Sequence, residues 1–383
     1  GFIDYDRDGD QDLFITQDNN NGNILLRYED YGAYMDISAI SQTDLKVMGM
    51  GVAFGDIDRD GLFDFYTTNL YENSLLLNSI SGVFTDISAS SGTEDTPGSM
   101  GWGTFFFDAN NDGWVDIYNN NETAFGGVIN SLMINQGDQT FNMLNYESGA
   151  VINNNGYGSA FSDFDRDGDL DMILVGHPSS SGSINLLRND SDPQNWIMFK
   201  LSQLEQNIYG VGSTIELYHG NTRQLNFIGA GNGYCSQNTL DVHFGLGQET
   251  IIDSVIVFWP DGISESFSGL VFNEINYLNR GTGIAILSNT SESFLPEIIR
   301  LNDPYPNPFN NSTTLEIQVA KDTKSTLHIY NLKGQGIATF NVQLQKSIMN
   351  HYKINFSDFP SGIYFVNIQS SEFSVMKKIT LLK

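Results

Sequence analysis

Four segments of the chain place oxygen-bearing side chains at alternating positions. They begin at Asp4 (DYDRDGDQD), Asp56 (DIDRDGLFD), Asp108 (DANNDGWVD) and Asp163 (DFDRDGDLD), which lie 52, 52 and 55 residues apart. Each segment has aspartate at positions one, five and nine and glycine at position six. Clustered oxygen ligands suit calcium, which takes about six to eight of them. The segments therefore predict a calcium loop in each repeat and about four ions in the chain.

The predicted ligands of each loop are the side chains at positions one, three, five and nine and the backbone carbonyl at position seven. Loop one offers Asp4, Asp6, Asp8, Asp12 and the carbonyl of Asp10. Loop two offers Asp56, Asp58, Asp60, Asp64 and the carbonyl of Leu62. Loop three offers Asp108, Asn110, Asp112, Asp116 and the carbonyl of Trp114. Loop four offers Asp163, Asp165, Asp167, Asp171 and the carbonyl of Asp169.

Two other interpretations, an EF-hand and an ordinary solvated turn, explain these loops less well. An EF-hand needs a bidentate glutamate at position twelve and flanking helices, but the chain has Ile15, Thr67, Asn119 and Leu174 there and β-like flanks. Asp and Gly are also common in ordinary solvated turns. Carboxylates packed into one turn, however, repel each other by about 1 kcal/mol per close pair unless a cation intervenes. Because the same pattern occurs in four copies, metal binding is favoured over ordinary turns.

The loops lie in repeated units of about fifty residues. A Gly-x-Gly element, which begins at Gly49, Gly101 and Gly156, opens an apolar stretch before loops two to four, and a short apolar run follows every loop. Further along come the runs ILLRY, SLLLN, SLMIN and NLLRN. Short apolar runs separated by Gly, Asn, Asp and Ser predict four strands per unit. This length fits one four-stranded propeller blade.

The units resemble the FG-GAP or VCBS repeats of integrin α-chain-like propellers over residues 1–192. The resemblance implies an all-β partial propeller of about four four-stranded blades, in which calcium is mainly structural. The first unit starts three residues before its loop, and the fourth leaves little room for a last strand. We therefore expect an open arc with an exposed apolar flank beside Phe2 and Ile3, and further blades upstream in the full-length protein.

Residues 193–288 predict a small β domain, because apolar residues alternate between glycine turns. The elements GVGS, HFGLG (from His243) and WPDG (from Trp259) resemble the ASPIC/UnbV domain, which follows such repeats in the cartilage acidic protein family and its bacterial relatives. The resemblance implies no defined chemistry. The single Cys235 has no partner for an internal disulfide and is expected as a small buried side chain.

Residues 289–300 have the Ser, Asn, Thr and Pro composition of a linker. Residues 301–383 contain YPNPFN, strand-like runs, GIYFV and a basic end, which predict a small immunoglobulin-like β-sandwich. These motifs resemble the C-terminal sorting domain of the type IX secretion system. The resemblance implies that the type IX machinery is a partner, that the chain crosses the outer membrane of a Bacteroidetes-like bacterium, and that the tail is removed afterwards.

Charge and hydropathy exclude several partners. The chain has a net charge of −28, and residues 1–192 alone hold 31 Asp and Glu against 6 Lys and Arg. So acidic a protein is unsuited to nucleic acid or anionic lipid, which both need basic surface. No apolar run reaches the roughly 18 residues of a membrane span. These features fit a secreted or cell-surface protein.

No catalytic constellation is visible in the sequence. The five histidines lie in separate segments, and no GxSxG nucleophile elbow occurs. We therefore expect a non-enzymatic, calcium-binding adhesion or ligand-binding module that recognises an extracellular protein or glycan. The alternative is a secreted enzyme that uses the propeller as a scaffold and acts on polysaccharide as a lyase or hydrolase.

Overall fold

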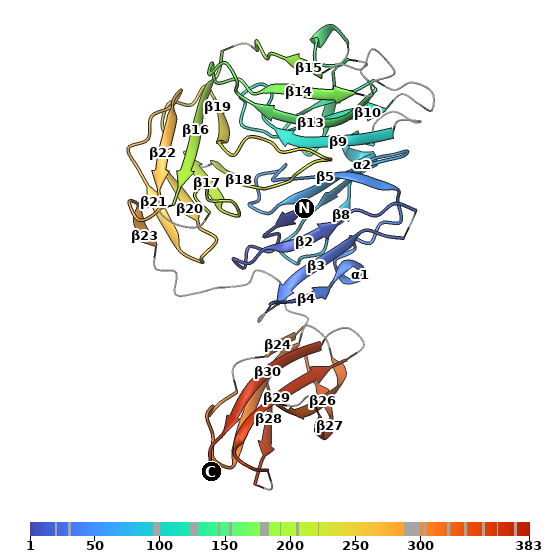
Figure 1. Cartoon of the computed structure of the whole chain (residues 1–383), viewed down its shortest axis with the longest axis vertical. Helices are drawn as coiled ribbons and strands as arrows, with labels where there is room; N and C mark the ends of the chain where they lie inside the picture. The colour runs from blue at the N-terminus through green and yellow to red at the C-terminus, as the bar shows by residue number, and fades with distance from the viewer. Residues whose placement is uncertain are drawn as a thin grey trace. The chain divides into compact units, whose positions relative to one another are not determined.

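The computed structural model is almost entirely β-stranded, which confirms the predicted all-β fold class (Figure 1). It describes all residues except 20, 30–31, 95–99, 123–128, 145, 153–154, 177–183, 192, 204–206, 221, 287–298, 302–303, 320–321, 333–334, 347–348, 358 and 371–373. The chain divides into two compact units, Gly1–Phe294 and Leu295–Lys383. Most of the predicted linker 289–300 lies outside the described residues, and the predicted domain limits stay predictions.

Each repeat folds into its own antiparallel sheet, with strands in sequence order. Sheet one contains β1 (Phe2–Ile3), β2 (Asp12–Ile15), β3 (Ile24–Glu29) and β4 (Ala33–Asp36). Sheet two contains β5 (Gly49–Gly55), β6 (Asp64–Asn69), β7 (Ser74–Leu77) and β8 (Thr85–Asp86). Sheet three contains β9 (Met100–Phe107), β10 (Asp116–Glu122), β11 (Ser131–Asn135) and β12 (Phe141–Met143). Sheet four contains β13 (Gly156–Ser162), β14 (Asp171–Gly176) and β15 (Ile184–Leu187). One-turn helices α1 (Ser38–Ser41), α2 (Ser88–Ser91) and η2 (Tyr146–Ser148) follow the first three sheets.

Successive sheets pack face to face along an arc, in the manner of propeller blades (Figure 1). Aromatic side chains fill the space between them, because alternate strand residues point toward the neighbouring sheet. Ring contacts join sheets one and two (Phe14 and Phe65, centroids 4.9 Å apart), two and three (Tyr66 and Phe106, 6.3 Å) and three and four (Phe105 and Phe161, 5.1 Å). Among the described residues, no buried cluster joins sheet one to sheet four, so the arc is open.

The open apolar flank lies on sheet four. In sheet three, the cross-strand pair Tyr118 and Leu132 is buried between sheets three and four. The corresponding pair in sheet four, Ile173 and Leu186, is 42% and 57% exposed. The expectation beside β1 was half wrong, since Phe2 is 49% exposed but Ile3 packs into the core between sheets one and two.

The next part of the chain forms two packed sheets within the first unit. The three-stranded sheet has the order β19 (Val242–Gly247), β16 (Asn195–Ser202) and β22 (Ile275–Asn279). The five-stranded sheet has the order β18 (Thr222–Phe227), β17 (Thr214–His219), β20 (Ser254–Phe258), β21 (Ser264–Phe267) and β23 (Ile284–Ile286). Apolar residues from both sheets, among them Phe199, Leu217 and Val255, form one buried core. Cys235 between β18 and β19 is exposed, which corrects the expectation of a buried thiol.

The segment between β18 and β19, residues 229–241, runs across the first strands of three blades. Gly233 donates its backbone N–H to the carbonyl of Val52 in β5 at 3.0 Å. Ser236 accepts the backbone N–H of Ser159 in β13 at 3.0 Å through its Oγ. The first strand of each blade lines the centre of a propeller. This segment therefore occupies the centre of the arc.

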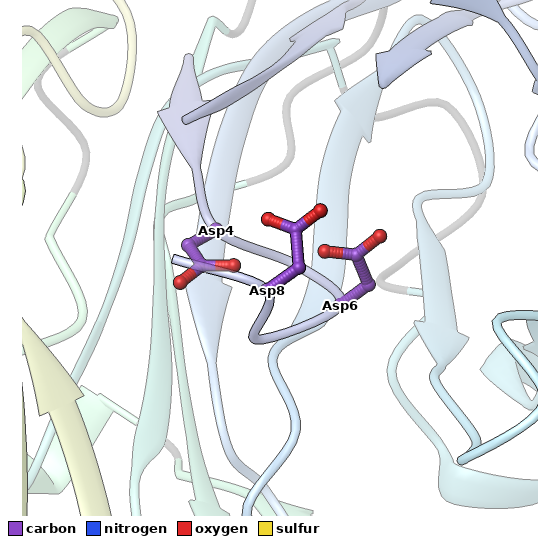
Figure 2. A group of neighbouring side chains, drawn as sticks. All are labelled: Asp4, Asp6 and Asp8. Carbon is purple, nitrogen blue, oxygen red and sulfur yellow. The ribbon is translucent and has the colours of Figure 1, made fainter. Parts of the chain in front are cut away.

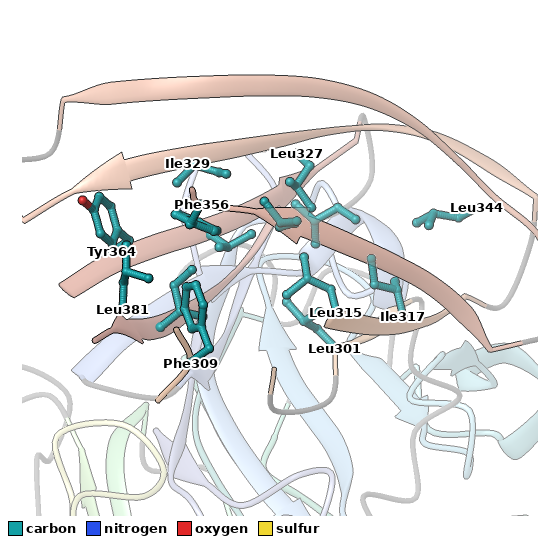
Figure 3. Packing of buried hydrophobic residues seen from close by; sticks show 14 of the residues in the cluster. Leu301, Phe309, Leu315, Ile317, Leu327, Ile329, Leu344, Phe356, Tyr364 and Leu381 are labelled. Carbon is teal, nitrogen blue, oxygen red and sulfur yellow. The ribbon is translucent and has the colours of Figure 1, made fainter. Parts of the chain in front are cut away.

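The second unit is a two-layer β-sandwich, as predicted for the tail. One sheet has the order β24 (Ile299–Leu301), β25 (Ser312–Val319) and β28 (Asn350–Asn355). The other has the order β27 (Gly336–Leu344), β26 (Thr323–Asn331), β29 (Gly362–Gln369) and β30 (Ser374–Leu381). Fully buried residues such as Leu315, Ile329 and Phe356 fill the space between the sheets (Figure 3).

Close contact between blades requires glycine at the Gly-x-Gly elements. A Cβ atom on Gly103 would lie 2.6 Å from both the carbonyl oxygen of Tyr157 and Oγ of Ser159 in the next blade. Gly103→Ala should therefore lower the free energy of unfolding of the first unit by about 1–3 kcal/mol. Gly336→Ala in β27 is the control, because its Cβ would be 3.8 Å from the nearest atom. Urea unfolding curves in which both variants lose equal stability would contradict this account.

Candidate metal sites

Each acidic loop connects the first and second strands of its sheet. Position nine opens the second strand in all four sheets. The residue at position four is left-handed in every loop, with φ near 60° at Arg7, Arg59, Asn111 and Arg166. Glycine at position six also has positive φ, between 85° and 97°. These two positions turn the chain back sharply, so side chains at alternating positions converge on one point.

This convergence brings the carboxylates of one loop close together. In loop one, carboxylate oxygens of Asp4, Asp6 and Asp8 lie within 4.8 Å of one another, all on the turn between β1 and β2 (Figure 2). Loop two gathers Asp56, Asp58 and Asp64, and loop four gathers Asp163, Asp165 and Asp171. In these two loops the aspartate at position nine joins the cluster instead of the predicted ligand at position five. Loop three has the amide of Asn110 at position three, so one of its ligand oxygens is uncharged.

The aspartate at position one leaves one oxygen unsatisfied in loops one to three. Its Oδ2 accepts the N–H of the glycine at position six, at 2.7–3.1 Å. Its Oδ1 is buried and has no hydrogen-bond partner in Asp4, Asp56 and Asp108. The side chains are only 8%, 4% and 6% exposed. A buried, unpaired carboxylate oxygen is costly, and a cation in the loop would satisfy it.

The raised pKa values of the loop aspartates also favour a cation in each loop. Burial, together with the neighbouring charge of Asp8, raises the pKa of Asp4 to about 7. Burial acts in the same direction on Asp56 and Asp108, whose pKa values also rise to about 7. Asp6 reaches about 8 through burial and repulsion from Asp8 and Asp4. The charges of Arg7, Arg27 and Arg223 offset only part of these effects, so the loops hold their carboxylates against both desolvation and repulsion.

Position nine has a structural function that the sequence analysis missed. In loop two, Asp64 accepts the N–H of Ile57 at 2.9 Å and the N–H of Asn78, at the end of β7, at 2.8 Å. The aspartates at position nine of the other loops make the same pair of bonds, namely Asp12 with Tyr5 and Tyr28, Asp116 with Ala109 and Asn135, and Asp171 with Phe164 and Asn189. Each of these buried carboxylates therefore ties its loop to the third strand. Asp64 and Asp171 also lie within the carboxylate clusters, so they combine both functions.

The asparagine that ends the third strand carries the connection to the preceding blade. Asn78 donates through Nδ2 to the carbonyl of Tyr5 in loop one at 3.1 Å. Asn135 and Asn189 bond the position-two carbonyls of loops two and three in the same manner, at 2.9 and 2.8 Å. The signal was present in the runs SLLLN, SLMIN and NLLRN, where asparagine recurs at the same place.

The residue at position four reaches forward to the next loop. Arg7 donates to the carbonyl of Gly61 in loop two at 3.2 Å, and Arg59 donates to the carbonyl of Asp112 in loop three at 3.4 Å. The Arg59 guanidinium also lies 3.7 Å from the centre of the Trp114 ring. Asn111 donates to the carbonyl of Gly168 in loop four at 3.3 Å. The four loops are therefore connected in series.

Residues 193–286 cover the loop face through three polar contacts that the sequence did not reveal. Glu216 of β17 forms an ion pair with Arg7 at 2.9 Å, and both side chains are nearly buried. Arg223 of β18 donates to the carbonyl of Asp60. His243 of β19 lies 3.0 Å from the carbonyl of Gly168 through Nε2, and burial lowers its pKa to about 4. Neutral His243 donates to the loop and is structural.

Substitutions in loop two separate the structural carboxylate from the ligands. Asp64→Asn places an amide N–H₂ against a backbone N–H, so we expect a loss of about 1–3 kcal/mol in the free energy of unfolding even in EDTA. Asp60→Asn is the matched control, because its remaining Oδ1 can still accept the N–H of Leu62. The control should change stability little in EDTA but weaken calcium binding. Equal losses for both variants in EDTA would show that Asp64 is not a structural clamp.

Three protein-family models match three successive parts of the chain. The FG-GAP-like repeat model matches residues 4–67, the ASPIC and UnbV model matches residues 203–284, and the secretion system C-terminal sorting domain model matches residues 304–381. All three predicted resemblances are confirmed. In the described part of the chain, no helix has the length and apolar character of a membrane span.

Relatives cover part of the chain. Cartilage acidic protein 1 of Xenopus tropicalis is 28% identical over 66% of this chain and 40% of its own length. The human protein is 29% identical over 66% and 39%. The chain thus spans about two fifths of these relatives.

A solved structure of PorZ, a surface component of the type IX secretion system of Porphyromonas gingivalis, is 12% identical and aligns with 98% of this chain and 58% of its own, at a TM-score of 0.27. The chain combines an FG-GAP-like repeat, an ASPIC and UnbV domain and a C-terminal sorting domain, and the sorting domain marks it for secretion to the cell surface or beyond.

Proposed function

We propose that this chain is a calcium-stabilised binding module that acts at the cell surface or outside the cell. The observation that carries the proposal is the buried, unpaired Oδ1 of the position-one aspartate in loops one to three. In loops one and two these oxygens belong to turns on which other carboxylates converge, and in loop three the side chain of Asn110 can add an uncharged oxygen. Hard oxygen donors of this kind match calcium rather than softer metals.

The donor set of each loop fits one ion. The side chains at positions one, three and five and the carbonyl at position seven would provide most of the ligands, and position nine would add a carboxylate oxygen that is already oriented by two backbone N–H groups. Calcium would neutralise the negative charges of aspartates such as Asp4 and Asp6, whose ionised form is disfavoured by burial and by repulsion. The bound loop would then hold the first, second and third strands of its blade in one arrangement.

A binding function fits the positions of the two described histidines of the first unit better than catalysis does. His219 and His243 are buried, and their ring nitrogens lie within hydrogen-bond distance of Gln224 and of the Gly168 carbonyl. The loop carboxylates would be engaged by the proposed calcium ions. On a secreted chain, the propeller surface would recognise an extracellular protein or glycan, as adhesion modules do.

Removal of calcium should destabilise the first unit alone. A ligand that binds only the folded state adds about 2.7 kcal/mol per site when its free concentration is about 100 times Kd. Calorimetry in EDTA should therefore show a large fall in the melting temperature of Gly1–Phe294. The second unit, Leu295–Lys383, has no acidic loop and serves as an internal control. An unchanged first transition in EDTA would contradict the proposal, and magnesium, which requires tighter octahedral geometry, should restore it poorly.

The sorting domain should be absent from the mature exported protein. The support is its match over residues 304–381 and its near-neutral charge beside a very acidic body. Mass spectrometry of the protein from the cell surface and culture fluid should find a product that ends near residue 300. Recovery of exported protein that ends at Lys383 would argue against processing.

A further inference from the structure

The x residues of the Gly-x-Gly elements converge at the end of the arc opposite the acidic loops. A Cβ atom on Gly51 would lie 2.2 Å from the carbonyl oxygen of Trp102, and one on Gly103 would lie 2.6 Å from the carbonyl oxygen of Tyr157. Neighbouring first strands therefore approach each other without intervening side chains. Trp102 and Tyr157 are thereby brought together, with ring centroids 5.0 Å apart.

The segment that crosses the arc adds a third ring to this pair. Tyr234, in residues 229–241, places its ring 4.9 Å from that of Trp102. All three aromatic side chains are partly exposed. Their rings are tilted by 48° and 55° relative to Trp102, so they form an angled aromatic cluster rather than a flat stack.

One carboxylate is fixed beside these rings. Glu122, the last residue of β10, accepts the indole N–H of Trp102 through Oε2 at 2.9 Å. Its Oε1 accepts the hydroxyl of Tyr157 at 3.0 Å. Each carboxylate oxygen has a second lone pair, and the side chain is partly exposed. The two donors hold this acceptor in one orientation before any ligand arrives.

We propose that Trp102, Tyr157, Tyr234 and Glu122 form a binding site for a neutral oligosaccharide, an inference that rests on the proposed binding function and names its ligand class. Sugar rings offer apolar C–H faces that pack on aromatic side chains, and hydroxyl groups that donate to a carboxylate. Mostly apolar surfaces with a few fixed polar groups are typical of small-molecule sites. Charge selects the class of sugar, since a region with a net charge of −25 repels uronates and sulfated glycans.

The exposed Cys235 beside Tyr234 provides a reporter for this site, because it is the only cysteine in the chain. The calcium-loaded chain is titrated calorimetrically with soluble gluco-, xylo-, manno- and N-acetylglucosamine oligosaccharides, and the alkylation rate of Cys235 is followed in parallel. We expect saturable binding by at least one of them, with slower alkylation. Oligogalacturonate, which is anionic, should not bind.

Glu122→Gln keeps the shape of the side chain but removes its charge, so it should weaken this binding at least about tenfold. Tyr157→Phe should weaken it by a smaller factor, because it removes one of the two groups that orient Glu122. Tyr71→Phe, at an exposed tyrosine outside the site, is the matched control and should bind normally. Circular dichroism of each variant verifies that it is folded.

Failure to bind any neutral oligosaccharide would overturn the inference, as would binding that Glu122→Gln leaves unchanged or a preference for oligogalacturonate. The calcium dependence of melting is measured on the same samples without sugar. A calcium-dependent melt without sugar binding overturns only the inferred ligand. A calcium-independent melt overturns the proposed role of calcium, whatever the sugar result.

Discussion

The arrangement of the blades depends on one interaction that recurs in every acidic loop. A buried aspartate at position nine accepts one backbone N–H from its own loop and another from the end of the third strand, as Asp64 does with Ile57 and Asn78. Burial of a carboxylate is expensive unless its oxygens are hydrogen-bonded. The hydrogen bonds from the two N–H groups offset part of that cost. They also give both backbone N–H groups an acceptor outside the strand pairing. Loop, second strand and third strand therefore cannot shift independently.

Further contacts extend this local constraint along the arc. The asparagine after the third strand of sheets two to four reaches back to the preceding loop, and the residue at position four of loops one to three reaches forward to the next loop. Between these polar contacts, aromatic side chains fill the space from blade to blade. Glu216 and His243 then connect the loop face to the following β-sheets. A change in the charge of one loop would therefore alter its contacts with the neighbouring loops and with the sheets that cover them.

The sequence predicted the repeated loops and blades, but it missed several of the contacts that join them. Four loops in register, with Asp4, Asp56, Asp108 and Asp163 at their starts, were enough to predict blades and a turn on which carboxylates converge. The side-chain bonds from each third-strand asparagine to the preceding loop were predictable in principle, because that asparagine recurs in three of the repeats. By contrast, the contact of Glu216 with Arg7 joins residues 209 positions apart and occurs once, so no periodicity signals it. The aromatic cluster was equally hidden, because Tyr234 reaches Trp102 only through tertiary folding. Exposure of Cys235 follows from the same segment, whose path across the arc is set by strands distant in sequence.

Residues 229–241 also constrain the order in which the molecule can assemble. Their partners, Val52 and Ser159, precede them by about 180 and 77 residues. Contacts between distant parts of a chain form late, since the entropy of closing the intervening loop is lost before the contact is gained. The blades can therefore pair their own strands early, while the centre of the arc stays unfilled until this late segment arrives. Assembly of the first unit is thus completed from its C-terminal side, and a chain interrupted before this segment would have blades without a filled centre.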